Sequence, residues 1–347
     1  MNKTPLLLGA LLALVSCADE DALPQPDSPE AAFVPEGYTE EDGASFPDFD
    51  RVDGRIDGTY ALDCADTLGV HAFACAEQLF WQAVQFEPQA RLEAHVTLSA
   101  LIDRLEATEG SLDSHRLALL HWRKAQLTLM LVSEHEERST LASALDALQR
   151  AHALEPDHVP IQSWLDTFEV TVAVAGAQAV GMPVDPAFGV DDKLRITEEN
   201  AAEDFTAFYN FIITASAMPA ASGWPDAAAD LVESLRDEYS GAGAGFNVAL
   251  RAPFVAQGVH ITYGEVLARA GRKEQALAQL ETALAMPGSD VWPYRSHAQD
   301  MVDQIDAMIG EFEALGPDQG AFFKLRILGD MGCSMCHMPE GQPPVPR

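Results

Sequence analysis

Apolar residues recur every three or four positions from about Cys64 to Met331, and the strict alternation typical of strands is scarce. This spacing places apolar side chains along one face of a helix and predicts an all-α chain. Turn-forming residues interrupt the pattern at "FEPQ", "TEGSLDS", "LEPDHVP", "GMPVDPAFG", "MPAASGWP", "SGAGAGF", "MPGSD" and "LGPDQG". We therefore expect about ten helices of about 12–22 residues, joined by short turns.

One of these interruptions is rich in glycine, at Gly241, Gly243 and Gly245. A phosphate-binding loop would need a preceding strand and a following G-K-[ST], and the sequence has neither. We expect a flexible turn there.

Three of the expected helices share one arrangement of small and large residues. An alanine is followed by a large apolar residue four positions later, by an alanine three further on, and then by a proline. The three copies are Ala76, Phe80, Ala83 and Pro88; Ala144, Leu148, Ala151 and Pro156; and Ala276, Leu280, Ala283 and Pro287.

This arrangement resembles the second helix of the tetratricopeptide repeat, whose small residues let neighbouring helices approach closely. Before the third copy, Tyr263, Gly264 and Leu267 fall where the first helix of that family has Leu, Gly and Tyr. The resemblance implies a solenoid of helical hairpins over residues 61–317, although the register is interrupted around 176–245. A generic bundle of α-helical hairpins is the alternative.

The N-terminus has the pattern of an export signal. Lys3 precedes an apolar run from Leu6 to Val15, which is too short to span a bilayer. The run ends in Leu-Val-Ser-Cys at Cys17 and resembles the lipobox of bacterial lipoproteins, which implies a signal peptide over 1–16 and acylation of Cys17. With Ala18 next, we expect an anchor in the outer membrane, facing the periplasm or the cell surface. An ordinary cleaved signal is the alternative.

Residues 17–60 differ in composition, with prolines scattered among Asp, Glu and Gly. This composition predicts a disordered acidic tether. Asp48, Asp50, Asp53 and Asp57 suggest calcium, but the spacing departs from the EF-hand loop and no glutamate closes it.

The chain is strongly acidic, with 54 acidic and 21 basic residues and a formal charge of −33. Such a surface repels nucleic acid and favours basic partners. We therefore expect no nucleic acid among its ligands.

The five cysteines divide into three groups. Cys17 belongs to the lipobox, and Cys333 and Cys336 form C-x-x-C-H with His337. Cys64 and Cys75 remain, and in an exported protein we expect them to form a disulfide.

C-x-x-C-H is the attachment motif of c-type haem, in which two thiols bind the porphyrin and the histidine binds iron. The stretch from Gly320 resembles the opening of a cytochrome c domain, which implies one haem c held by a segment over 318–347. A disulfide between Cys333 and Cys336 is the main alternative; a redox dithiol or a zinc site lacks the usual surrounding pattern.

The sequence stops ten residues after His337, so the usual downstream ligand for the second face of the haem is absent. A partner or the helical body would have to supply it, unless the iron stays five-coordinate. The nearest candidates in sequence are His260, His297, Met286, Met301, Met308 and Met331, although a core methionine or a surface histidine is the favoured interpretation of each.

The sequence carries no H-E-x-x-H, G-x-S-x-G or P-loop pattern. We expect a lipid-anchored protein that transfers electrons to or from a docked, basic redox partner. A repeat scaffold with Cys333 and Cys336 as a structural disulfide is the second hypothesis, and a haem enzyme or gas sensor is the third.

Overall fold

The computed structural model describes residues 72–73, 75–77, 79–80, 88–108, 112–135, 138–179, 189–245, 254–321 and 324–327. Within these ranges all regular structure is helical and there is no strand. The prediction of an all-α fold is confirmed for this part of the chain. The predicted signal peptide, the tether and the motif at residues 333–337 lie outside it.

The first half of the described chain consists of four long helices after the helical residues between 72 and 80. They are α3 (Pro88–Ala107), α4 (Ser114–His135), α5 (Arg138–Leu154) and α6 (Val159–Ala179). Successive members of the series pack against one another, with α4 and α5 in the most extensive contact.

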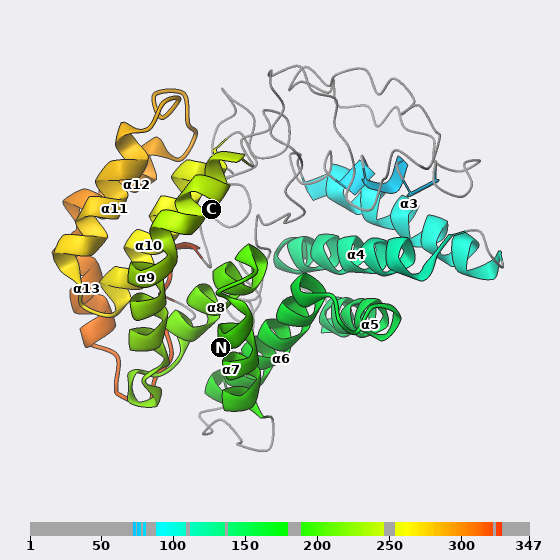
Figure 1. Cartoon of the computed structure of the whole chain (residues 1–347), viewed down its shortest axis with the longest axis horizontal. Helices are drawn as coiled ribbons and strands as arrows, with labels where there is room; N and C mark the ends of the chain where they lie inside the picture. The colour runs from blue at the N-terminus through cyan, green and yellow to red at the C-terminus, as the bar shows by residue number, and fades with distance from the viewer. Residues whose placement is uncertain are drawn as a thin grey trace.

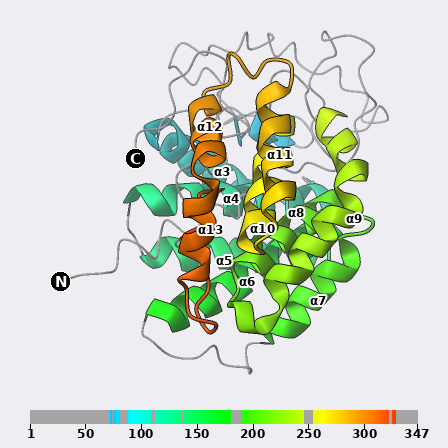
Figure 2. The same cartoon turned by 90° about the vertical axis from the view of Figure 1, so that its left-hand side faces the viewer.

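The second half contains helices that, with the exception of α9, are shorter. They are α7 (Val190–Asn200), α8 (Phe205–Ala217), the 3-10 turn η4 (Ala220–Ser222), α9 (Trp224–Gly245), α10 (Val255–Arg269), α11 (Lys273–Ala285), α12 (Arg295–Asp303) and α13 (Ile305–Glu313). Figure 1 shows α3 to α5 on one side of the molecule, α9 to α13 on the other, and α6 to α8 between them. In Figure 2, α11, α12 and α13 face the viewer.

The helix ends follow local signals in several places. The side chain of Asp204 accepts a hydrogen bond from the backbone N–H of Ala207, 2.6 Å away, and so caps α8. The turn between α10 and α11 contains Gly271 with a φ of 74°, a left-handed conformation that disfavours residues with a Cβ. Pro156 and Pro287 follow the ends of α5 and α11, as the sequence predicts.

The turn predicted at Gly241, Gly243 and Gly245 is wrong, because α9 continues to Gly245. Each glycine inside a helix costs about 1 kcal/mol relative to alanine, but a helix that is already formed and packed can absorb this cost. α4 also ends at His135 and α5 begins at Arg138, where no glycine or proline marks a break.

The described apolar core divides into two clusters that meet within α6. The N-terminal core runs from Ala72 to Phe168, and the C-terminal core from Val170 to Ile327. Every residue of α8 and of α10 is buried, so these two helices form the centre of the second half.

The hairpin of α10 and α11 is held at very short range. A Cβ built on Gly264 would lie 2.6 Å from Leu280 Cδ2, closer than atoms can pack. Ala276, Leu280 and Ala283 are fully buried on the facing side of α11. The small residues therefore have the role that the sequence assigns to them, since they allow two helices to touch.

Candidate functional site

Most of the predicted site residues lie outside the described part of the chain. This holds for Cys333, Cys336 and His337 of the haem motif, and for Cys17 and Cys64. Cys75 is described: it is buried and forms a disulfide. Its pairing with Cys64 stays a prediction.

Part of the segment that precedes the predicted haem motif is described, and this part lies against the helical body. We call residues 316–321 and 324–327 the C-terminal strap. The backbone N–H of Ala221 donates to the carbonyl of Pro317, and the N–H of Ala321 donates to the carbonyl of Ala217, both over 2.8 Å. Leu325 and Ile327 are buried in the C-terminal core.

Glu265 of α10 holds the last residues of the strap. Its side chain is fully buried. Its carboxylate accepts hydrogen bonds from the backbone N–H of Arg326, at 2.6 Å, and from that of Ile327, at 2.8 Å. Cys333, the first cysteine of the predicted motif, follows Ile327 by six positions in the sequence.

Arg269 lies one helical turn beyond Glu265 and contacts the same region. Its guanidinium donates to the carbonyl of Met218 over 3.2 Å and stacks 5.7 Å from the centre of the Phe312 ring. Burial lowers the pKa of Arg269, an effect partly opposed by the charge of Asp226. Arg269, which belongs to α10, therefore contacts both the C-terminal end of α8 and α13.

Among the candidate second ligands, His260 has the environment that best fits a metal-binding imidazole. It is almost fully buried, and its Nδ1 lies 2.7 Å from Gln279 Oε1. Burial lowers its pKa, while the hydrogen bond to Gln279 raises it and the charge of Arg236 lowers it further. A neutral ring whose second nitrogen is fixed by a hydrogen bond is typical of metal ligands.

The position of His260 does not favour that role. His260 and Glu265 are five residues apart on α10, which places them about 140° apart around the helix axis. His260 therefore faces Gln279 of α11, whereas Glu265 faces the strap.

The remaining described candidates lie where packing and helix capping explain their presence. Met301 and Met308 are buried in the C-terminal core, Met286 caps the end of α11, and the half-buried His297 packs its ring 5.3 Å from that of Tyr294. Met331 lies outside the described residues. The structure brings none of the described candidates to Glu265 by a hydrogen bond or ring contact.

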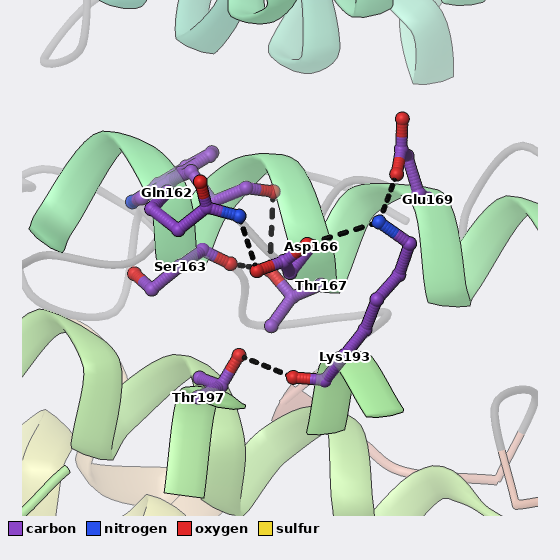
Figure 3. A network of polar contacts seen from close by, with 8 residues as sticks. Gln162, Ser163, Asp166, Thr167, Glu169, Lys193 and Thr197 are labelled. Carbon is purple, nitrogen blue, oxygen red and sulfur yellow. Dashed lines mark hydrogen bonds and ion pairs between the residues drawn. The ribbon is translucent and has the colours of Figure 1, made fainter. Parts of the chain in front are cut away.

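A separate polar cluster joins α6 to α7 (Figure 3). Lys193 Nζ lies 3.0 Å from Asp166 Oδ1 and also pairs with Glu169. Gln162 donates to the other oxygen of Asp166 over 2.5 Å. Burial lowers the pKa of Lys193, but its hydrogen bonds to the two carboxylates outweigh burial and the pKa is raised. The positive charge in this cluster is the ammonium of Lys193, which both carboxylates bind. The cluster therefore cross-links α6 and α7.

Sequence reasoning missed Glu265 and Asp166, because so acidic a chain has carboxylates everywhere, and it also missed Arg269. The available signal was position: Glu265 lies in the run "YGEVLA", with apolar residues on both sides. A charged residue on a helix that is apolar on every face needs a buried partner.

Two further searches of the described residues give negative results. No helix among them is long and apolar enough to cross a membrane. They also contain no group of three or more His, Cys, Asp or Glu side chains placed to hold a metal ion. Compared with known proteins, the chain matches no family model, no curated protein and no solved structure.

Proposed function

We propose that the protein is a lipid-anchored, exported c-type haem protein that exchanges electrons with a docked partner. The observation that carries this proposal is the C-x-x-C-H motif of Cys333, Cys336 and His337, which begins six positions after a segment held on the helical body. A motif on an isolated tail would have no protein against which to place a haem.

The donor set fits a haem by its chemistry. Cys333 and Cys336 would bind the porphyrin through two thioether bonds, and His337 would bind the iron as the proximal ligand. The haem, when bound, supplies a one-electron couple. The helical body or a partner would supply the second ligand, or the iron would stay five-coordinate.

The described residues add indirect support. The strap is buried at Leu325 and Ile327 and bonded at Glu265, so the chain is held on the helical body up to six positions before Cys333. The second half of the molecule is dense with aromatic contacts, such as that of Phe208 with Tyr263 at 5.8 Å. A rigid support of this kind limits the reorganisation that accompanies electron transfer.

The rest of the chain fits a protein of the bacterial cell envelope. We propose that acyl chains on Cys17 anchor it to the outer membrane, facing the periplasm or the cell surface, and that residues 17–60 act as the tether. We further propose that the helical hairpins form a tetratricopeptide-like solenoid, supported by the close approach of Gly264 to Leu280. The net charge of −33 would attract a basic partner, more weakly as salt rises.

The test is the alkaline pyridine haemochrome spectrum of the full chain, expressed with a haem-attachment system and then denatured. We expect a c-type band that survives denaturation and disappears in the Cys333→Ala, Cys336→Ala double variant. A control cytochrome matured in the same cells shows that the system works. Absence of the band in the wild-type chain, with the control intact, contradicts the proposal.

The second candidate is a scaffold lipoprotein in which Cys333 and Cys336 form only a disulfide. It is favoured by the packed hairpins α4–α5 and α10–α11, which resemble protein-binding repeats more than an enzyme. Mass spectrometry separates the two candidates, because a disulfide lowers the mass by two hydrogens whereas a covalent haem adds its full mass. Binding of carbon monoxide to the reduced protein would instead indicate an open iron site, as in a sensor.

A further inference from the structure

Glu265 occupies a place where a carboxylate is costly. It lies near the middle of α10, a helix whose fifteen residues are all buried. A buried charge is tolerated only when it is paired and hydrogen-bonded. Two of the donors that Glu265 uses are the backbone N–H groups of Arg326 and Ile327, both from the strap.

The recognition is directed at the backbone of the strap. Two consecutive N–H groups point at the two oxygens of one carboxylate, Arg326 at Oε1 and Ile327 at Oε2. This geometry fixes the direction of the chain as well as its position. Apolar packing of Leu325 and Ile327 alone would tolerate a shift along α10, whereas the paired hydrogen bonds would not.

The strap is held at successive points in chain order. Pro317 is bonded to Ala221, Ala321 to Ala217, and Ile327 to Glu265. Arg269, one turn after Glu265 on α10, donates to the carbonyl of Met218, the residue next to Ala217. Glu265 is the last of these points before the haem motif.

We propose that Glu265 is the positioning residue for the haem: its carboxylate fixes the strap to α10 and so sets where the C-x-x-C-H motif leaves the body. This inference rests on the proposed function, since it gives the position of the same haem.

Conservative variants test separately the acceptor oxygens of Glu265, the length of its side chain and the backbone donor of Ile327. Glu265→Gln keeps the shape but replaces one acceptor oxygen by an N–H₂ group that opposes a backbone donor. Glu265→Asp keeps both acceptors and the charge on a shorter side chain. Ile327→Pro leaves α10 untouched and removes one donor, with Ile327→Ala as the control for the lost side chain.

The chain offers a matched control for loss of a buried carboxylate. Glu77 is also fully buried, but it lies in the N-terminal core and pairs with Arg123. Glu77→Gln should lower the overall stability without touching the strap.

The experiment measures amide hydrogen exchange of the peptide covering 321–327 and the reduction potential, both in the haem-loaded full chain. We expect exchange about tenfold faster or more in Glu265→Gln and in Ile327→Pro, because a charge-assisted hydrogen bond is lost. The potential should rise in Glu265→Gln, since removing a negative charge near the haem makes the reduced state more favourable. Glu265→Asp should recover part of both changes, and Glu77→Gln and Ile327→Ala should show neither.

Two outcomes overturn the inference. Haem-loaded Glu265→Gln and Ile327→Pro with wild-type exchange and potential would show that the carboxylate does not position the strap, while the proposed function stands. If Glu77→Gln accelerates the exchange of the 321–327 peptide equally, the effect of Glu265→Gln reflects a loss of overall stability and not the release of the strap. A wild-type chain without covalent haem overturns the proposed function itself, and the haemochrome spectrum identifies that case separately.

Discussion

Among the described residues, each half of the molecule fully buries one glutamate, and the two glutamates interact with groups of different kinds. In the N-terminal core, Glu77 meets Arg123 Nε at 2.9 Å, and both side chains are fully buried. The guanidinium also lies 5.0 Å from the Phe80 ring centre and 4.8 Å from that of Trp122. In the C-terminal core, Glu265 instead uses backbone donors from the strap.

The difference lies in the kind of partner and in its distance along the sequence. Glu77 and Arg123 pair within the N-terminal core. Glu265 accepts two hydrogen bonds from backbone groups 61 and 62 positions further along the chain. Docking of the strap should therefore contribute to the stability of the second half, and this contribution has no counterpart in the pair of Glu77 and Arg123.

The largest effect is expected for Arg123→Met. Removing one partner leaves the Glu77 carboxylate buried opposite an apolar side chain, which should cost about 3–5 kcal/mol of the free energy of unfolding. Because a buried pair contributes little net stability, Glu77→Leu combined with Arg123→Met should recover most of this loss. Urea unfolding followed by circular dichroism measures both variants.

An exposed pair serves as the control. Arg195 and Asp192 interact at the surface of α7, and Arg195→Met should cost less than about 1 kcal/mol. A loss of similar size in Arg123→Met would mean that water reaches the Glu77 site and that the N-terminal core is not closed.

The second prediction sharpens the comparison at the hairpin of α10 and α11. Gly264→Ala places a methyl group 2.6 Å from Leu280 Cδ2 and 3.3 Å from the carbonyl oxygen of Ala276. We expect a loss of about 1–3 kcal/mol from overpacking. Leu280→Ala should relieve the clash, so the two changes should couple by about 1 kcal/mol or more in a double-mutant cycle.

Gly310→Ala is the matched control, because Gly310 also lies within a helix but has open space where a Cβ would be. It should be neutral or stabilise the protein by up to about 1 kcal/mol. If the two alanine variants behave alike, the close approach of α10 and α11 is not a constraint on the sequence.

The hairpin residues were predictable because helix packing leaves a periodic pattern. Ala144, Leu148 and Ala151, like Ala276, Leu280 and Ala283, recur at helical spacing and are all fully buried. Short-range signals placed several breaks between helices as well, such as those after Ala107, Leu154 and Ala285. They were wrong at Gly241–Gly245, where a long packed helix overrode local propensity. They also missed the breaks between α4 and α5, α7 and α8, α10 and α11, and α12 and α13.

The contacts of the site could not be predicted, because they join residues far apart in sequence. The motif of Cys333, Cys336 and His337 is visible in the sequence, but the apolar neighbours of Glu265 are the only sign of its burial there, and they do not indicate its partners. With 54 acidic residues, one more glutamate has no distinguishing pattern until the burial of α10 is known. Tertiary structure, which brings the strap to α10, supplies the missing information.

The smallest expected effect is a pH dependence carried by buried histidines in both halves. Burial lowers the pKa of His95 and His121 in the N-terminal half and of His260 in the C-terminal half, and a hydrogen bond to Glu106 partly offsets this for His121. Each lowered pKa means that the unfolded chain binds a proton more readily than the folded one. The free energy of unfolding should therefore fall as pH drops below the unfolded value of about 6.5, and level off below the folded pKa.

Each histidine contributes a slope of at most about 1.4 kcal/mol per pH unit within that window. His260→Gln should remove the C-terminal share, and His95→Gln with His121→Gln the N-terminal share, when urea unfolding is measured between pH 5 and 8. If both sets of variants keep the wild-type slope, other groups control the acid response. If His260→Gln alters the pH dependence only of the unfolding transition that releases the strap, the two halves unfold as separate units. Such a result would agree with the different partners of Glu77 and Glu265.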